Sequence, residues 1–461
     1  MVRKRYSTEC RGLTFKKMLF TVSFVFGISF SVRMLGVSEF WRCNEHLLPS
    51  PTALQYIAKA LHALYNVRLH NSIHGSEERE LLENTELLLR RHLDLEDKKS
   101  KEKGKPLRGS CAPRRHIFFL KTHKTASSTI MNILFRFGDL RNLSFAHPTN
   151  GNSQFSYPSY FSSRFVDAFY QGNCSMFHIM CQHMRFQLTE VEKVMPRDTF
   201  YFTILRNPVS QMESSFSYYK SIGVFSKAKS LEDFLHNASR YYEIKGLSRS
   251  YAKNLMTFDL GLNPDGILST KQFQLNWRTV ETVFDLVLIT DYFDESLVLL
   301  KDALCWTLED VASFPLNTRT NSTKKNLSEE TQDMIKSWNA LDWQLYIYFN
   351  HSFWNRVEIY GRKRMQREVE ELRKLRANIS MTCLEGEVDP ANLQDKSLKP
   401  YQSGIARILG YNLKPGLGPA DKLLCQRMVT PELQYTHLLV QKQKQSKYYC
   451  VEKKEPVTKN L

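Results

Sequence analysis

The sequence predicts an α/β fold in which a central parallel sheet is flanked by helices, preceded by a transmembrane helix and a helical stem. Three short runs of apolar residues, 117–120, 199–205 and 284–289, are each followed by a helical pattern. Strands that alternate with helices favour a parallel sheet with helices on both faces. The 461 residues, 42% hydrophobic and 24% charged, are enough for one large domain of this kind plus accessory segments.

An uncharged segment near the amino terminus predicts a membrane anchor. Residues 18–32 read MLFTVSFVFGISFSV, and six Lys and Arg residues precede them. As a helix this segment rises only ~22 Å, but the flanking basic side chains can snorkel to the interfaces. Because basic residues are denser before the segment than after it, we expect 1–17 to be a cytosolic tail, 18–35 a signal-anchor and the rest lumenal. A cleaved signal peptide is the alternative, although no A-x-A site follows.

Residues 36–113 have no strand pattern and predict a lumenal stem. Leucines recur at helical spacing between 81 and 93, and the charged run EDKKSKEKGKPLRGS reads as a solvated linker. An oligomerisation seam is the alternative for these leucines, but it would cover few heptads. We expect the catalytic domain at 114–435, with two long helices at 327–350 and 353–378, and a basic carboxyl-terminal tail at 436–461.

The charge and the cysteines limit the classes of partner. Lys and Arg outnumber Asp and Glu by 64 to 47, a net charge of +17 that favours anionic ligands, acidic glycans or membrane surfaces. No nucleic-acid-binding motif accompanies the charge, so we expect no nucleic acid partner.

The nine cysteines form no C-x-x-C pair, which argues against a zinc ribbon, and the eight after Cys10 could form disulfides in a lumen. Seven N-x-[ST] sequons, all after the anchor, support a lumenal domain.

The segment FFLKTHKTASSTIMNILFRF predicts a strand, a loop at Lys121–Thr129 and a helix. Backbone N–H groups and the positive end of the helix dipole would face an anion in this loop. The side chains of Lys121 and Lys124 add charge, and the hydroxyls of Thr125, Ser127, Ser128 and Thr129 add donors. The Walker pattern G-x-x-x-x-G-K-[ST] is absent, which disfavours a nucleoside triphosphatase.

The segment TILRNPVSQMESSFSYY places Arg206 at the end of a strand and Ser214 on the following helix. Arginine presents a forked donor to phosphate, and a serine one or two helical turns further can bind the same anion. The alternative for Arg206 is a structural ion pair.

These two segments, together with CQHMRF, DESLVLLKDALCW and PYQSGIARILGYNLKPGL, resemble the galactose-3-O-sulfotransferase family, nearest to its type-two, glycoprotein-acting branch. The similarity runs from about Ile117 to Tyr435 in five separated blocks. It implies a P-loop-like sulfotransferase fold, 3′-phosphoadenosine 5′-phosphosulfate (PAPS) as sulfuryl donor and no required metal. It also implies transfer to the C3 hydroxyl of non-reducing β-galactose on glycoprotein glycans, by a single-pass type II protein of the Golgi membrane with a lumenal catalytic domain. The lipid-acting branch shares nearly all these blocks, so galactosylceramide is the alternative acceptor, and the oligomeric state stays open.

The resemblance also implies roles for individual residues. The loop Lys121, Thr122, His123, Lys124, Thr125, Ala126, Ser127, Ser128 and Thr129 would hold the 5′-phosphosulfate, and Arg206 and Ser214 the 3′-phosphate. Lys124, or alternatively Lys121, would stabilise the departing phosphate oxygen. His183 is the favoured general base, because CQHMRF resembles the base-bearing segment of the heparan 2-O-sulfotransferases, and His123 is the competing base.

Other residues and other functions remain alternatives. Arg185 would bind acceptor or sulfate oxygens, or form a surface ion pair, and Tyr218, Tyr219, Trp277 and Trp306 could stack on a sugar or belong to the core. A kinase-like phosphoryl transferase would need Mg²⁺ and carboxylates to hold it. A catalytically silent glycan-binding protein is the third class.

Overall fold

The computed structural model describes residues 111–167, 176–243, 247–266 and 270–445. The expected cytosolic tail, the signal-anchor at 18–35 and nearly all of the stem lie outside these residues. Within the described ranges, no helix combines the length and the apolar character needed to cross a membrane.

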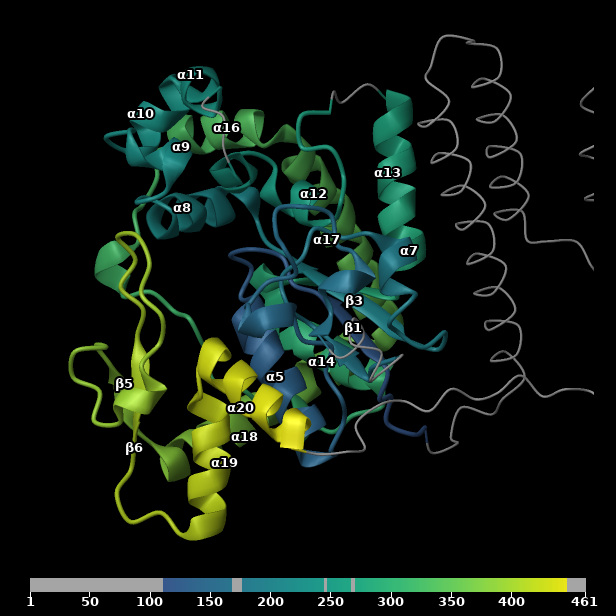
Figure 1. The fold of residues 1–461 in the computed structure, drawn as a ribbon, viewed down its shortest axis with the longest axis vertical. Helices are drawn as coiled ribbons and strands as arrows, with labels where there is room; N and C mark the ends of the chain where they lie inside the picture. Colours follow the sequence, from purple (N-terminus) through teal and green to yellow (C-terminus); the bar gives the residue numbers. More distant parts are fainter. Residues whose placement is uncertain (1–110, 168–175, 244–246, 267–269, 446–461) are drawn as a thin grey trace, which may run out of the picture. The chain divides into compact units, whose positions relative to one another are not determined.

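A four-stranded parallel sheet lies at the centre of the described domain (Figure 1). Its strand order is β2 (Ile179–Met180), β1 (Ile117–Leu120), β3 (Phe200–Leu205) and β4 (Leu286–Ile289). All residues of the four strands are buried, which explains why their sequences are continuous apolar runs. The three predicted strands are confirmed, whereas β2, with two residues, was too short to be recognised.

The parallel register brings the carboxyl ends of the strands to one edge of the sheet. Leu120 of β1 pairs with Thr203 of β3, and Leu205 pairs with Ile289 of β4. In open α/β sheets the ligand binds beyond this edge, where loops lead from strands into helices. The fold therefore places both predicted anion-binding segments at the same edge.

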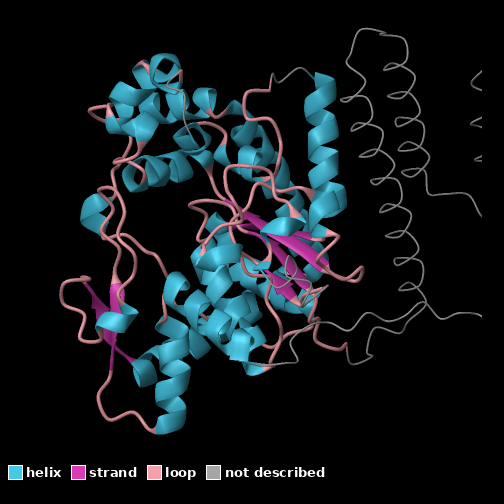
Figure 2. Cartoon of the chain, viewed as in Figure 1, coloured by secondary structure: helices cyan, strands magenta, loops and turns pink. Residues whose placement is uncertain are grey.

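Helices flank the sheet (Figure 2). Helices α14 and α17 pack against β4, α5 follows β1, and α20 packs against α5. A separate two-stranded antiparallel sheet is formed by β5 (Leu384–Val388) and β6 (Gly410–Leu413). The helices are α5 (Ser127–Leu140), α7 (Leu188–Val191), α8 (Pro208–Tyr218), α9 (Gly223–Ser226), α10 (Leu231–His236), α11 (Ala238–Tyr242), α12 (Leu255–Asp259), α13 (Thr270–Val283), α14 (Phe293–Leu304), α15 (Leu308–Val311), α16 (Glu329–Trp338), α17 (Ala340–Tyr360), α18 (Arg362–Cys383), α19 (Pro419–Val429) and α20 (Glu432–Gln445).

The helix boundaries predicted between 327 and 378 are wrong. The structure has three helices here, α16, α17 and α18, and the predicted break between 350 and 353 lies inside α17. The first break is at Asn339, whose side-chain oxygen accepts the N–H of Asn254 at 2.8 Å. The second is at Gly361, whose φ of 96° is readily accessible only to glycine. The first break thus coincides with a tertiary contact and the second with a backbone turn. The spacing of apolar residues predicted neither position.

Helix α20 continues past residue 435, where we expected the catalytic domain to end. Lys442 forms an ion pair with Asp139 at 2.7 Å, and the side chain of Gln443 bonds to both backbone groups of Phe145. The first part of the expected basic tail is therefore a docked helix, because its polar residues have partners on and just after α5.

Two disulfides connect distant parts of the described chain. Cys111 pairs with Cys305, and Cys383 pairs with Cys425. Cys181, which we had included among cysteines able to pair, is a free buried thiol whose pKa is raised by burial.

Candidate active site

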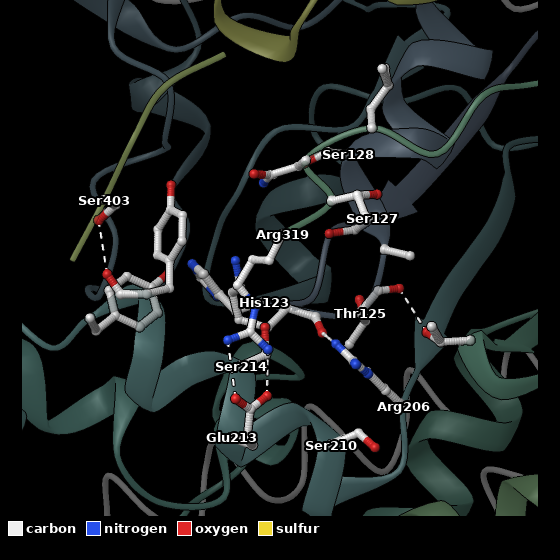
Figure 3. Close-up of a pocket in the computed structure, with 18 of the residues that line it drawn as sticks. His123, Thr125, Ser127, Ser128, Arg206, Ser210, Glu213, Ser214, Arg319 and Ser403 are labelled. Atoms are coloured by element: carbon white, nitrogen blue, oxygen red, sulfur yellow. Dashed lines mark hydrogen bonds and ion pairs between the residues drawn. The ribbon is translucent and has the colours of Figure 1, made fainter. Parts of the chain in front are cut away.

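A cleft of about 1160 Å³ opens at the carboxyl edge of the sheet (Figure 3). Its described lining includes the loop after β1, His183, the end of β3, helix α8, residues 316–319 and 324–327, and the start of α20. Six of the lining side chains are basic and two are acidic: Lys121, Lys124, Arg206, Arg319, Lys324 and Lys325, against Glu213 and Glu432. A concave surface with this excess of positive charge suits an anionic ligand.

The loop between β1 and α5 is held by its own hydroxyl groups. Thr125 and Ser127 both donate to the carbonyl of Thr122, at 3.1 and 2.7 Å. Lys124 and Ala126 have positive φ angles of 62° and 60°, which form the tight turn into the helix. The first turn of α5 contains no acidic residue. The hydroxyls predicted to bind the anion are therefore partly committed to the loop, whereas the first-turn N–H groups of α5 are the kind of donors that an anion could use.

Two of the predicted loop residues do not line the cleft. Thr122 donates to Ile204 of β3 at 2.5 Å, and the Thr129 hydroxyl accepts the N–H of Leu316 at 3.0 Å. Both side chains are buried. They position the loop against its neighbours, and Lys121, His123, Lys124, Thr125, Ala126, Ser127 and Ser128 form the wall of the cleft.

The pKa of the Lys124 side chain is lowered by its surroundings, from 10.5 to about 7. Burial has the largest effect, and the nearby positive charges of Arg319 and Arg206 add to it. Its Nζ lies 3.6 Å from the centre of the Tyr218 ring, and among the described residues no carboxylate forms an ion pair with it. An anion in the cleft would supply the missing counter-charge and stabilise the protonated form.

Arg206 joins the two segments that the sequence had singled out. Its Nη1 donates to the carbonyl of Lys124 at 2.9 Å, and burial lowers the pKa of its guanidinium (Figure 3). Ser214, on α8, is 4% exposed and lines the same cleft. The structure therefore brings Arg206 and Ser214 together with the loop.

The two candidate bases are stacked on one another. The ring centroids of His123 and His183 are 3.8 Å apart with planes 10° from parallel, and both side chains line the cleft. His183 Nδ1 lies 3.1 Å from the carbonyl of Lys121, which can only accept, so Nδ1 carries the proton and Nε2 is free to accept one. The pKa of His183 lies well below its usual value. Burial has the largest effect, and the nearby His123 and Lys121 lower the pKa further.

Asp259 was not predicted, yet it fixes the orientation of His123. The carboxylate is fully buried, lies 3.0 Å from His123 Nδ1 through each oxygen, and accepts the backbone N–H of His123 at 2.8 Å. Tyr157 donates a further hydrogen bond at 2.9 Å. His123 Nε2 is buried, and none of the residues that the structure describes forms a hydrogen bond with it. In the sequence, Asp259 is the charged residue of the otherwise uncharged segment Leu255–Leu262, and this was the one signal that could have identified it.

Arg319 and Glu432 are among the charged residues of the cleft that the sequence analysis missed. Arg319, 7% exposed, forms a two-pronged ion pair with Glu213 of α8. Glu432, at the start of α20, pairs with Lys121 at 2.6 Å. Both lie far along the chain from the loop, in segments without a recognisable pattern.

The remaining candidates divide between cleft and core. Tyr218 and Tyr219 line the cleft, whereas Trp306 is 5% exposed and stacks on Phe137 in the core. Trp277 stacks on Tyr348 and is not part of the described cleft lining. Arg185 also lies outside that lining, and its guanidinium rests on the rings of Tyr160 and Phe258. In the described residues, no group of three or more His, Cys, Asp or Glu side chains could hold a metal ion.

Comparisons with known proteins identify the family of this chain. The family model of galactose-3-O-sulfotransferase matches residues 74–443. Galactose-3-O-sulfotransferase 2 of Sus scrofa is 47% identical over 337 residues, which cover 72% of this chain and 85% of that protein. The galactosylceramide sulfotransferase of Homo sapiens is 46% identical over 334 residues, covering 71% and 78%. Human galactose-3-O-sulfotransferase 4 is 38% identical over 417 residues, covering 74% and 85%. The chain therefore belongs to the galactose-3-O-sulfotransferase family of enzymes.

Proposed function

We propose that this enzyme transfers the sulfuryl group of PAPS to the C3 hydroxyl of terminal β-galactose on glycoprotein glycans. One observation carries the proposal: a single cleft contains the cationic loop after β1, Arg206 and Ser214 beyond β3, and two stacked imidazoles. These are the groups needed to bind a donor with an anionic group at each end and to remove one proton from an alcohol.

The positions of the groups support a division of the cleft between donor and acceptor. Arg206 follows β3 and Thr290 follows β4, on one side of the loop. His183 follows β2, on the other side of β1. We assign the 5′-phosphosulfate to the loop 121–129, the 3′-phosphate to Arg206 and Ser214, and the acceptor sugar to the side of His183.

The reaction requires an in-line displacement at sulfur. The galactose O3–sulfur bond forms while the bond from sulfur to the 5′-phosphate oxygen breaks, the O3 proton moves to an imidazole, and 3′-phosphoadenosine 5′-phosphate (PAP) leaves. Lys124 is our candidate for stabilising the charge that develops on the departing oxygen, with Lys121 as the alternate. Since its pKa is about 7, Lys124 would hold its proton most firmly when that charge is largest.

His183 remains our first candidate for the general base. Its tautomer leaves Nε2 as a proton acceptor, and the negative charge of a bound donor would oppose the lowering of its pKa. His123, with an unpartnered Nε2 and the buried Asp259 behind it, is the alternate. Because the two rings stack, the orientation of whichever imidazole is the base depends on the other one as well.

The relatives support a galactose acceptor but do not decide which molecule carries the galactose. A galactose-3-O-sulfotransferase 2 and a galactosylceramide sulfotransferase match this chain almost equally, at 47% and 46% identity. We propose a glycoprotein glycan as the natural carrier and galactosylceramide as the alternative.

The proposal is tested by giving the purified enzyme radiolabelled PAPS with N-acetyllactosamine and, separately, galactosylceramide. We expect 3-sulfated N-acetyllactosamine as the preferred product. Faster turnover of galactosylceramide would assign the enzyme to lipid, and no transfer to any galactoside would overturn the proposed function.

We also propose a Golgi location, with residues 18–35 as a type II anchor and the catalytic domain in the lumen. The two disulfides and the exposed sequon residues Asn237, Asn326 and Asn378 support an oxidising, glycosylating compartment. Protease protection of a carboxyl-terminal tag in sealed Golgi vesicles is the expected result. Cleavage of that tag without detergent would contradict the orientation.

A further inference from the structure

An acidic side chain lies inside the anion-binding part of the cleft. The Glu432 carboxylate accepts hydrogen bonds from Lys121 Nζ at 2.6 Å and from Ser128 Oγ at 2.7 Å. Lys121 and Ser128 are two of the groups assigned to the 5′-phosphosulfate, and the Glu432 side chain is 17% exposed. The proposed donor ligands are thus already occupied by a carboxylate, which would repel an incoming phosphosulfate.

Glu432 is held near this place by the helix to which it belongs. Helix α20 is tied to the body of the domain by the ion pair of Lys442 with Asp139 and by the bonds of Gln443 to Phe145. Its first turn contacts the segment before His183, because Gln182 donates to Thr436 at 3.1 Å. The carboxylate is therefore anchored between the donor loop and the acceptor side, and we expect it to change partners while the helix stays in place.

Losing both donors would be unfavourable for a largely buried carboxylate. A buried acceptor left without a hydrogen bond is unfavourable, and more so when it is charged. Burial opposes ionisation of Glu432, but the Lys121 ion pair and the Ser128 hydrogen bond outweigh it and lower the pKa, so the group is ionised and can only accept hydrogen bonds. Galactose carries neighbouring hydroxyl groups that could donate to the two carboxylate oxygens.

We infer that Glu432 is an acceptor-positioning residue, which exchanges Lys121 and Ser128 for hydroxyl groups of the galactose when the donor binds. This inference rests on the proposed function, because it takes the loop as the donor site. It means that donor binding uncovers part of the acceptor site, so PAP and the galactoside should bind with positive coupling.

The inference is tested with Glu432→Gln, which keeps the size of the side chain and removes its charge. Affinities for PAP and N-acetyllactosamine are measured by titration calorimetry, each with and without the other ligand, and turnover is measured in parallel. In the unaltered enzyme, PAP should strengthen N-acetyllactosamine binding at least fivefold. In Glu432→Gln this coupling should disappear and the acceptor KM should rise at least tenfold, with PAP affinity equal or tighter.

Asp139→Asn is the matched control, because it weakens the ion pairs with Arg427 and Lys442 while Asp139 lies outside the described cleft lining. It should keep the coupling, and Glu432→Asp, which keeps the charge, should restore part of it. The inference is overturned if Glu432→Gln keeps the coupling, if it weakens PAP binding more than threefold, or if it lowers kcat a hundredfold with KM unchanged, as expected for a proton acceptor. Failure of the unaltered enzyme to bind PAP would instead overturn the proposed function.

Discussion

His123 and His183 stack with their ring centroids 3.8 Å apart, although 60 positions of sequence separate them. The contact forms because the loop after β1 and the segment after β2 leave neighbouring strands at the same edge of the sheet. The Nδ1 atom of each ring has a hydrogen-bond partner, the carbonyl of Lys121 for His183 and the carboxylate of Asp259 for His123. The pair presents two imidazoles of fixed orientation to one cleft.

Replacing His183 with alanine should abolish most of the turnover and leave donor binding intact. General-base catalysis contributes roughly 10²–10⁴-fold, so kcat should fall at least a hundredfold. PAP affinity, measured by calorimetry, should stay within about threefold, since His183 lies on the side away from Arg206. Normal turnover of His183→Ala, together with inactivity of His123→Ala, would move the base to His123.

Replacing Asp259 with asparagine should lower kcat by roughly 10–100-fold without weakening PAP binding. Asparagine can bond His123 Nδ1 in the wrong tautomer, as in other carboxylate–histidine pairs in which this change disturbs the ring. Tyr157→Phe is the control, because it removes a different hydrogen bond to Asp259 and leaves the imidazole contact. Equal kcat values for Asp259→Asn and Tyr157→Phe would argue against a positioning role.

Replacing Arg206 with alanine should weaken PAP binding by roughly 10–100-fold. A hydrogen bond to a charged group is worth about 1.5–3 kcal/mol, and Arg206 also supports the loop through the carbonyl of Lys124. The matched control is Arg185→Ala, whose guanidinium lies outside the described cleft lining. If both variants bind PAP like the unaltered enzyme, the 3′-phosphate lies elsewhere.

Donor binding should weaken as the pH rises above 7. The pKa of Lys124 is about 7 in the empty cleft, and a bound anion raises it, so the protonated enzyme binds PAP more tightly. Above pH 7 the free enzyme must take up a proton to bind, and affinity should fall by up to about tenfold per pH unit. Calorimetry between pH 7 and 9 measures this, and Lys124→Arg, which stays charged, should show a much flatter dependence. A flat profile in the unaltered enzyme would contradict the assigned titration.

Replacing Gly404 with alanine should destabilise the wall of the cleft behind Lys124. Gly404 has a φ of 60°, and an added Cβ would lie 2.4 Å from the carbonyl oxygen of Tyr218, the residue whose ring contacts Lys124. We expect a loss of about 1–3 kcal/mol in the free energy of unfolding and weaker PAP binding. Gly416→Ala is the control, because its φ is also positive but no atom lies within 4 Å of its Cβ position. Equal unfolding midpoints for the two variants would show that the contact is unimportant.

The sequence alone determined the parts of this enzyme that depend on local pattern. The buried strands β1, β3 and β4 were predicted from apolar runs, because a strand covered on both faces has nearly no polar position. The loop 121–129 and the pair Arg206 and Ser214 were recognised from residue type next to a strand end. The family was recognised from five blocks in order, and the family model confirmed it.

Tertiary structure alone decided which distant residues complete the site. Asp259 and Glu432 bond to the loop, and Arg319 lines the same cleft through its ion pair with Glu213. All three come from segments whose sequences carry no phosphate-binding pattern, since a single charged side chain has no periodicity. The helix break at Asn339 likewise depends on a contact with Asn254, which lies 85 positions away. Local pattern predicts which residues can bind an anion. The packing of the chain determines which charges balance those residues and which rings stack on them, because burial and Coulomb interactions act through space and not along the sequence.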